Sequence, residues 1–126
     1  MKNLKKHYRI KAIPEHVYKA LTNPLTIEMW SGSEAVMDAQ AGTEFSLWDG
    51  DITGLNIEFV ENQKIVQQWY FEGQEEKSLV TITLTPEGKD TRVEVLHINI
   101  PDEAFENIVD GWDHYYFKPL KQLVEE

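Results

Sequence analysis

The chain has 126 residues, of which 22 are acidic and 12 basic, giving a formal net charge of −10 with neutral histidines. This charge repels phosphate backbones and anionic lipid surfaces, so nucleic acid and membrane surfaces are excluded as expected partners. The sequence contains no cysteine, which excludes disulfides, thiolate nucleophiles and thiolate metal sites. The length suits one domain, residues 1–126, able to bury about two thirds of the surface exposed by its unfolded chain.

The N-terminal segment is basic and lacks an apolar run. The residues from Met1 to His7 therefore match neither a signal peptide nor a membrane span, and we expect a soluble protein without membrane insertion. The absence of cysteine fits a cytoplasmic location. From His7 to Ala12, polar and apolar residues alternate, which predicts a first half-buried strand.

Two short helices are predicted after this strand. Pro14 suits the first turn of a helix that ends before Asn23-Pro24. Asn23 can cap a second helix, which carries Trp30 near its end and stops at Ser31-Gly32-Ser33.

The region from residue 34 to residue 100 predicts a meander of antiparallel strands. The expected strands are residues 35–39, 44–48, 51–60, 65–71, 78–85 and 91–100. Asp49-Gly50 is a strong signal for a two-residue hairpin turn. Val80, Ile82 and Leu84 alternate with threonines, as in a sheet with one face on the core and the other in water. Together with the first strand, this gives six or seven strands.

The C-terminal segment predicts one long aromatic helix from Asp102, a candidate N-cap, to Val124. Pro119 predicts a kink, because proline lacks the N–H donor and clashes with the carbonyl of Tyr115. Large side chains recur on one helix face: Trp112, Tyr115, Tyr116, Leu120 and Leu123. Such a face needs a broad surface to pack against, and a sheet folded around it tends to enclose a cavity.

Short motifs along the whole chain match one superfamily in order. They are Pro14-Glu15, Gly42-Thr43-Glu44-Phe45, Asp49-Gly50, Gly54, residues 64–71, residues 80–84 and the block from Gly111 to Gln122. With the order of elements, they resemble the START-like, Bet v-type helix-grip superfamily, and most closely the C-terminal domain of activators of heat-shock protein 90 ATPase. The resemblance implies an α+β fold in which a curved antiparallel sheet of six or seven strands wraps around the long C-terminal helix.

The resemblance implies two activities. The superfamily generally holds a hydrophobic or amphipathic small molecule between sheet and C-terminal helix, and this non-enzymatic binding is the expected function. The alternative is a co-chaperone-like protein-interaction module. In the two-domain activators a preceding domain also contacts the chaperone, whereas this sequence begins at the helix-grip strand. The expected partners are therefore a hydrophobic small molecule or a chaperone, and the expected state is a monomer or homodimer.

The candidate ligand-binding residues are those that the predicted pattern turns into the space between sheet and helix, with Trp30 at the rim. They are Trp30, Phe45, Leu47, Trp69, Phe71, Val80, Ile82, Val95, His97, Trp112, Tyr116 and Leu120. Ligand sites are mostly apolar with a few polar groups, which His97 and Tyr116 could supply. The same residues also fit a filled core, in which His97 bonds to a backbone carbonyl or to water. Trp48 is expected near the open end, as an entrance residue or as a cover for the core.

Signals for an enzyme are weak, and no catalytic residue or cofactor is predicted. The sequence has no Gly-x-Ser-x-Gly elbow and no glycine-rich phosphate loop. Asp110 and His114 are one helical turn apart, but two ligands do not make a zinc site, so no metal is predicted. Some relatives of the fold act as cyclases or dehydratases with a pocket acid and base. His97 with Glu58 is the least unfavourable pair for that chemistry, so an enzyme is less expected than a binding protein.

Three acidic pairs have two interpretations. They are Glu75-Glu76, Asp102-Glu103 and Glu125-Glu126. Such charges usually mark solvated faces and helix ends, and the alternative is electrostatic docking on a basic partner.

Overall fold

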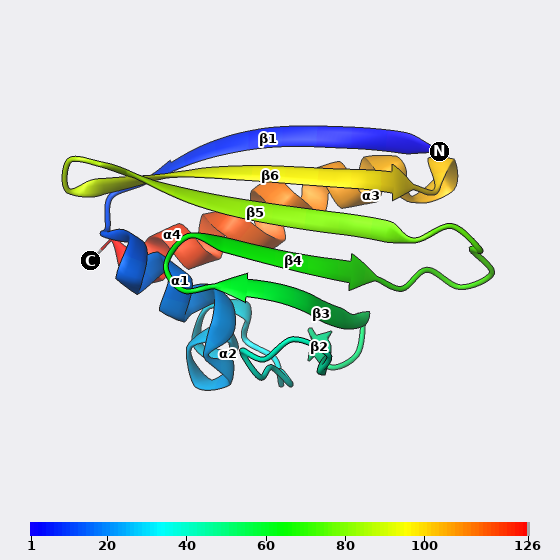
Figure 1. The fold of residues 1–126 in the computed structure, drawn as a ribbon, viewed down its shortest axis with the longest axis horizontal. Coiled ribbons are helices and arrows are strands. Elements are labelled where there is room, and N and C mark those ends of the chain that lie inside the picture. The colour runs from blue at the N-terminus through cyan, green and yellow to red at the C-terminus, as the bar shows by residue number, and fades with distance from the viewer. Residues whose placement is uncertain (126) are drawn as a thin grey trace.

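A six-stranded antiparallel sheet forms the centre of the computed structural model, which describes residues 1–125 (Figure 1). The strands are β1 (Lys2–Ile10), β2 (Glu44–Leu47), β3 (Ile52–Val60), β4 (Lys64–Trp69), β5 (Ser78–Glu87) and β6 (Asp90–Ile100). Their order across the sheet is β1-β6-β5-β4-β3-β2. The N-terminal strand therefore pairs with the last strand, while β2 to β6 form a meander. The predicted α+β helix-grip fold is confirmed.

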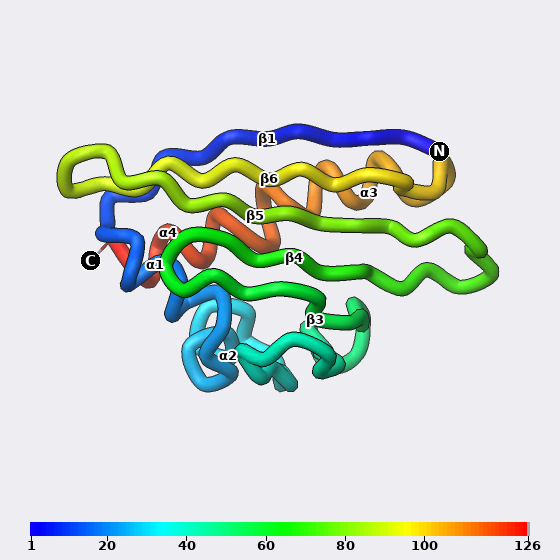
Figure 2. The backbone as a smooth tube through the Cα atoms, in the orientation of Figure 1, coloured from blue at the N-terminus to red at the C-terminus, as the bar shows by residue number. Residues whose placement is uncertain are grey.

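The helices pack on one face of the sheet. α1 (Pro14–Thr22) and α2 (Pro24–Ser31) follow β1, and Asn23 caps α2 as predicted, its Oδ1 accepting from the backbone N–H groups of Leu25 and Thr26. The C-terminal segment contains η1 (Asp102–Ala104), α3 (Phe105–Asp110), η2 (Gly111–Phe117) and α4 (Lys118–Val124). It crosses the sheet from the end of β6 toward α1 and α2, both of which contact α4 (Figures 1 and 2).

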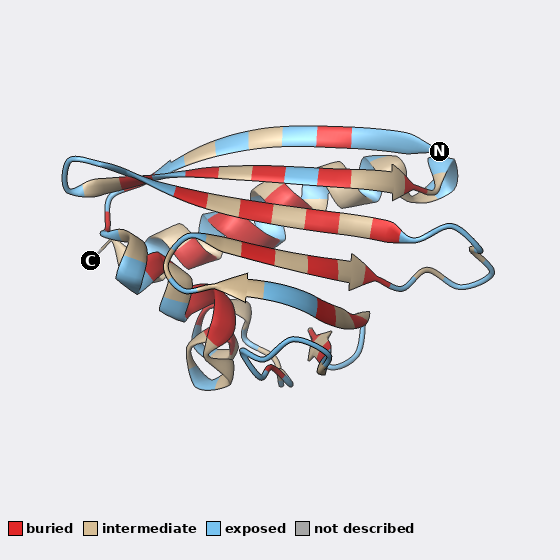
Figure 3. Cartoon of the chain, viewed as in Figure 1, coloured by how far each residue is buried: buried red, intermediate tan, exposed pale blue. Residues whose placement is uncertain are grey.

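Burial alternates along the strands, most clearly on β5 and β6 (Figure 3). Val93, Val95 and His97 are fully buried on the inner face, whereas Arg92 on the outer face is exposed. The alternation reflects the two-residue side-chain period of a strand. Each fully buried aliphatic side chain contributes about 1.5–3 kcal/mol relative to exposure.

Gly54 on β3 allows an unusually close approach of neighbouring groups. A Cβ at this position would lie 2.0 Å from the backbone oxygen of Gln68 and 2.7 Å from the ring of Phe45. Gly54 pairs with Phe45 on one side and with Trp69 on the other. The missing side chain therefore lets Phe45 pack against the backbone and helps to place Trp69 at the end of β4.

Several predicted strand limits differ from the structure, among them the end of β5, which runs to Glu87 rather than residue 85. Residues 35–39 form no strand, because Val36 makes a single bridge to Ser46 before the chain turns away toward Gly42. β4 ends at Trp69 rather than Phe71, ahead of the turn at Gly73. β1 begins at Lys2, before the alternating segment. Its first residues are mostly polar and do not alternate, but an exposed edge strand tolerates such residues.

The predicted N-cap role of Asp102 is wrong. No side-chain cap is present at the start of η1, and the Asp102 carboxylate lies 2.8 Å from the N-terminal ammonium group instead. Capping of the first turn is thus replaced by an ion pair that ties the N-terminus to the start of the C-terminal helical segment.

The C-terminal helix is not one regular α-helix, because η2 is wound as a π-helix. The backbone N–H of Lys118 bonds to the carbonyl of Asp113, five residues earlier. Pro119 cannot donate the α-helical bond to Tyr115, which favours a wider turn before it. Consequently Tyr116 and Phe117 are both buried while Tyr115 is 63% exposed. The prediction that Tyr115 shares the buried face is wrong.

Candidate functional site

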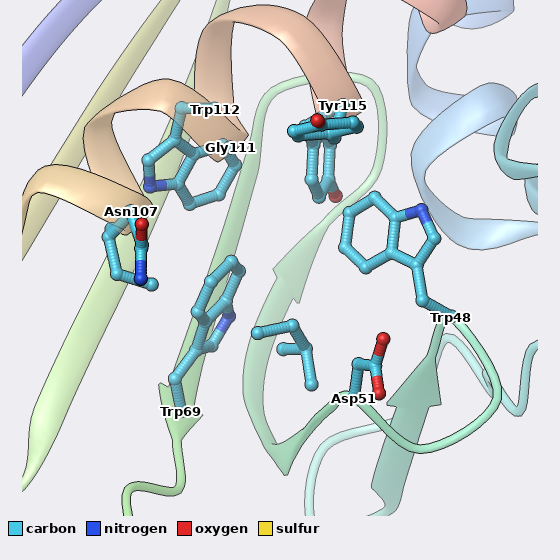
Figure 4. A pocket seen from close by; sticks show the side chains of 10 residues that line it. Trp48, Asp51, Trp69, Asn107, Gly111, Trp112 and Tyr115 are labelled. Atoms are coloured by element: carbon cyan, nitrogen blue, oxygen red, sulfur yellow. The ribbon is translucent and has the colours of Figure 1, made fainter. Parts of the chain in front are cut away.

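An aromatic groove of about 360 Å³ lies between the β2–β3 loop, the end of β4 and the C-terminal helix (Figure 4). Five of its lining residues are large aromatics: Trp48, Trp69, Trp112, Tyr115 and Tyr116. The other lining residues are Asp51, Ile52, Asn107, Ile108 and Gly111. The groove is thus mostly apolar, with one acid, one amide and the tyrosine hydroxyls as its polar groups.

Two stacked indoles form the floor of the groove. The rings of Trp69 and Trp112 are 4.8 Å apart and inclined by 25°, and both residues are buried. Tyr116 continues this layer, with its ring 4.7 Å from that of Trp112. Stacking of this kind adds about 0.5–1.5 kcal/mol per pair to the burial of the rings.

His97 holds the Trp112 indole in place. The Trp112 Nε1–H donates to His97 Nδ1 at 3.2 Å, and His97 Nε2 lies 2.8 Å from Ser78 Oγ. Ser78 Oγ in turn donates to the carbonyl of Ile98 at 3.1 Å. These partners assign the His97 proton to Nε2. Burial lowers the pKa of His97 to about 3, so the imidazole is neutral at physiological pH.

A chain of buried amides holds the Trp69 indole in place. Trp69 Nε1–H donates to Gln67 Oε1 at 3.1 Å, and Gln67 Nε2 donates to Asn56 Oδ1 at 2.9 Å. Asn56 Nδ2 then donates to Thr43 Oγ1 at 3.2 Å. Both indole N–H groups are thus satisfied inside the protein, and the floor offers aromatic faces rather than free donors to the groove.

The rim of the groove is built differently. Trp48 has φ 51°, an unusual backbone conformation for a bulky residue, and Asp49 and Gly50 follow with φ 55° and 96°. The backbone N–H of Asp51 bonds to the carbonyl of Trp48 at 3.1 Å, which closes the predicted Asp49-Gly50 turn as a type I′ turn. The Trp48 ring lies edge-on to Tyr116 at 5.8 Å. This turn holds Trp48 opposite Trp69 and Trp112 (Figure 4).

The Tyr116 hydroxyl is an unpartnered polar group of the groove. Only 3% of Tyr116 is exposed, and none of the side-chain hydrogen bonds within residues 1–125 involves its hydroxyl. No fully buried side-chain oxygen or nitrogen in that range lacks a partner, so the hydroxyl keeps a small exposed surface, and Tyr116 lines the groove. Burial raises the pKa of Tyr116, which keeps the phenol neutral.

Three of the predicted ligand-binding residues line the groove: Trp69, Trp112 and Tyr116. Most of the others are packed in the core: Phe45, Leu47, Val80, Ile82, Val95, His97 and Leu120. Trp30 is also buried, and its Nε1–H donates to the carbonyl of Ala20 at 2.8 Å. Phe71 is half-buried, with its ring 6.4 Å from that of His97. Binding of a ligand by any of these residues stays a prediction.

Several residues of this region were not singled out as site residues. Gln67 and Ser78 have the inward strand phase of Trp69 and Val80, so the alternation contained a signal for them. Asn56 precedes a bulge on β3, and no pattern marked it. Three further lining residues come from irregular parts of the chain: Asp51 from the turn before β3, and Asn107 and Tyr115 from the C-terminal helical segment.

The weak catalytic and metal hypotheses gain no support. His97 is fully buried, whereas Glu58 is on the exposed side of β3 and pairs with Lys64 at 3.4 Å, so His97 and Glu58 do not face one space. Asp110 and His114 form an exposed pair at 2.6 Å. Within residues 1–125, no group of three or more histidine, aspartate or glutamate side chains is arranged to hold a metal ion.

Two of the acidic pairs meet at one surface hollow. Glu75-Glu76 and Asp102-Glu103 line it together with Glu72. Glu125 accepts a hydrogen bond from the backbone N–H of Lys11 at 2.9 Å, whereas Glu126 lies outside the described residues. A concentrated negative surface therefore lies beside the N-terminus.

No helix between residues 1 and 125 is long and apolar enough to cross a membrane.

A curved sheet that grips a C-terminal helix and leaves an apolar groove at one end defines the START-like class of helix-grip domains. Within that class, the chain belongs to the family described as activator of Hsp90 ATPase homolog 1-like protein, whose family model matches residues 11–125. The family resemblance seen in the sequence is thereby confirmed.

Individual relatives agree with this assignment. The chain is 31% identical over 111 residues to the human activator of 90 kDa heat shock protein ATPase homolog 1, covering 86% of this chain and 33% of that protein. It thus spans about a third of the length of the curated relatives it matches. The crystal structure of an HSP90 activator from Plasmodium falciparum has a TM-score of 0.90 and 25% identity, covering 98% of this chain and 96% of that chain.

A further solved structure shares the fold. The solution structure of the Aha1 dimer from Colwellia psychrerythraea has a TM-score of 0.84 and 20% identity, covering 99% of this chain and 97% of that chain. A dimer is thus known for this fold, and the oligomeric state of the present chain stays a prediction.

Proposed function

We propose that this protein acts as a co-chaperone-like module that binds a 90 kDa heat-shock protein and raises its ATPase rate. The observation that carries the proposal is the family match, which extends from residue 11 to residue 125. It includes both the gripped helix and the strands that pack against it. The human relative, named as an activator of this ATPase, supports the same partner.

Two surface features support a role in protein contact. Leu25 and Met29 lie one turn apart on α2 and are 70% and 69% exposed, although both are large and apolar. The acidic hollow around Glu75, Glu76 and Glu103 complements a basic surface on a partner. Apolar contact would supply affinity, and the acidic hollow would increase the association rate.

Titration of the purified chain into a purified 90 kDa heat-shock protein tests the proposal. We expect a saturable rise in the inhibitor-sensitive ATPase rate. The double variant Leu25→Ser/Met29→Ser should raise the chain concentration needed for half of the maximal ATPase stimulation. It should keep the fold, because both side chains are mostly exposed. Glu87→Gln on the β5–β6 hairpin is a matched surface control. An unchanged ATPase rate at saturating chain concentration would end this proposal.

The groove supports a second function, the binding of a hydrophobic or amphipathic small molecule. Its volume of about 360 Å³ and its aromatic lining match the lower size range of ligand sites, about 300–1,000 Å³. Hexanol is a suitable neutral probe. We expect it to shift the indole N–H signals of Trp48, Trp69 and Trp112 in a nuclear magnetic resonance titration, and Trp30 less, because Trp30 is not in the lining. Absence of any shift with hexanol and with its charged hexyl analogues, each up to millimolar concentration, would exclude this function.

A further inference from the structure

The groove is lined by one negatively charged side chain and by no positively charged one. Asp51 is the single ionisable carboxylate among the lining residues, and these residues include no lysine, arginine or histidine. The whole chain carries a net charge of −10. An anionic head group in the groove would therefore meet a carboxylate and a negative overall potential without a cationic partner.

The aromatic faces add to this preference. Trp48 lies across the groove from Trp69 and Trp112, and Tyr115 lies between the two sides at the helix (Figure 4). The faces of aromatic rings are electron-rich and attract ammonium groups held over them, most strongly for tryptophan. Because both floor indoles direct their N–H groups into the protein interior, they present no donor that would repel a cation.

Two oxygens are free to receive the hydrogens of an ammonium group. The exposed Asp51 carboxylate makes no ion pair and no side-chain hydrogen bond with residues 1–125. The Tyr116 hydroxyl keeps a small exposed surface without a protein partner, and Tyr116 lines the groove. Asp113 on the C-terminal helical segment differs in this respect, since it binds Lys6 at 2.7 Å and Tyr8 at 2.8 Å. The free carboxylate at this site thus has no role in holding the described structure together.

We propose that the groove selects small amphipathic organic cations, namely a primary ammonium group on a short apolar body. The ammonium group binds at the rim, between Asp51 and the face of Trp48. The apolar body lies on the Trp69–Trp112 floor. This inference rests on the second proposed function, groove binding, and names its ligand class; it excludes fatty acids, whose carboxylate would lie beside Asp51.

Three probes with one alkyl chain separate charge from apolar contact. They are hexylammonium, hexanol and hexanoate, each titrated at neutral pH and low salt while the indole N–H signals are followed. We expect hexylammonium to bind about tenfold more tightly than hexanol, and hexanoate to bind more weakly than hexanol. Added salt should reduce the advantage of hexylammonium and leave hexanol unchanged.

One variant tests the assigned carboxylate. Asp51→Asn keeps the shape of the side chain and should bring the affinity for hexylammonium close to that for hexanol. Glu87→Gln removes one negative charge from the hairpin at the opposite end of the sheet (Figure 2), so it should leave the advantage intact. Unchanged Trp30 signals in both variants show that the fold is retained.

The possible outcomes distinguish the cation preference from groove binding itself. Equal affinity for hexylammonium and hexanol, or an Asp51→Asn variant that keeps the full advantage, overturns the cation preference while groove binding stands. If none of the three probes shifts Trp48, Trp69 or Trp112, both groove binding and the cation preference are wrong. The proposed chaperone interaction is unaffected by either result.

Discussion

The floor and the rim of the groove differ in how their aromatic rings are held. Trp69 and Trp112 are buried, stacked at 4.8 Å and bonded through their N–H groups to internal polar chains. Trp48 and Tyr115 instead project from a left-handed turn and a π-helical segment, and Tyr115 is 63% exposed. The groove is therefore lined by floor rings that stabilise the fold and by rim rings that contribute little to its stability. Changes in the floor should lower stability, and changes in the rim should lower binding.

The largest effect is expected at the floor. Trp112→Ala removes a ring that is 2% exposed and contacts Trp69, Tyr116 and Phe117. The lost packing and the remaining cavity should lower the free energy of unfolding by about 3–5 kcal/mol, as is typical for large aromatic residues in a core. Chemical denaturation measures this change. A loss below about 1 kcal/mol would mean that the floor is not part of the cooperative core.

His97 beneath the floor should make stability fall at acidic pH. Its pKa of about 3 in the folded protein is below its ordinary value of 6.5, so below pH 6.5 the unfolded chain takes up a proton that the folded protein refuses. The contribution of neutral His97 to the free energy of unfolding is therefore complete above pH 6.5 and is lost as the pH falls toward 3. Between pH 7 and pH 5, this loss is about 2 kcal/mol.

Comparison with His97→Gln isolates the contribution of His97 from those of the other titrating groups. The variant should be less stable at pH 7, because the bonds to Trp112 and Ser78 are altered, but its stability should change less between pH 7 and pH 5. Denaturation curves at the two pH values give both quantities. Identical pH dependence in the two proteins would contradict a neutral buried imidazole.

Gly111 lies where the floor meets the helix, and a substitution there should separate stability from binding. It has helical backbone angles, and a Cβ at this position meets no atom within 4 Å. Gly111→Ala should therefore raise the free energy of unfolding by about 0.5–1 kcal/mol, because alanine loses less backbone entropy than glycine. The same methyl group enters the lining of the groove and should weaken hexylammonium binding. A stabilised variant with unchanged affinity would show that ligands do not approach this part of the helix.

The smallest effect on stability is expected at the rim. Tyr115→Ala should change the free energy of unfolding by less than about 0.5 kcal/mol, as for most exposed residues. Its affinity for hexylammonium should nevertheless fall a few-fold, because one aromatic face of the groove is lost. Denaturation and titration of the same sample test both statements. A large loss of stability would remove the distinction between floor and rim.

The sequence predicted the inner face of the sheet well, because alternation in a strand depends only on its two-residue period. Val80, Ile82, Val95 and His97 are buried as that period requires. The same rule would also have turned Gln67 inward, but a polar residue in a core position depends on a partner, here Asn56 on the neighbouring strand. Partners that are distant in sequence are not visible in a local pattern.

The groove itself was less predictable. Its outline depends on the π-helical winding of η2, which turns Tyr115 out and brings Phe117 in. It also depends on the backbone of Trp48 at φ 51°, where a residue of this size is rarely found. Pro119 indicated an irregularity in the helix, but the helix prediction still assumed a period of 3.6 residues, and no local rule predicts a tryptophan at a positive φ.

The pairing of β1 with β6 joins residues 2–10 to residues 91–100, nearly the full length of the chain. Contacts so distant in sequence form late, since a large loop must close first. During synthesis β1 is made before β6, so it stays unpaired until residues 91–100 have been made. Its lysines, Lys2, Lys5 and Lys6, then oppose strand-to-strand association with other nascent chains. In this acidic protein, the basic residues of β1 thus protect a strand edge that stays open until its partner strand has been made.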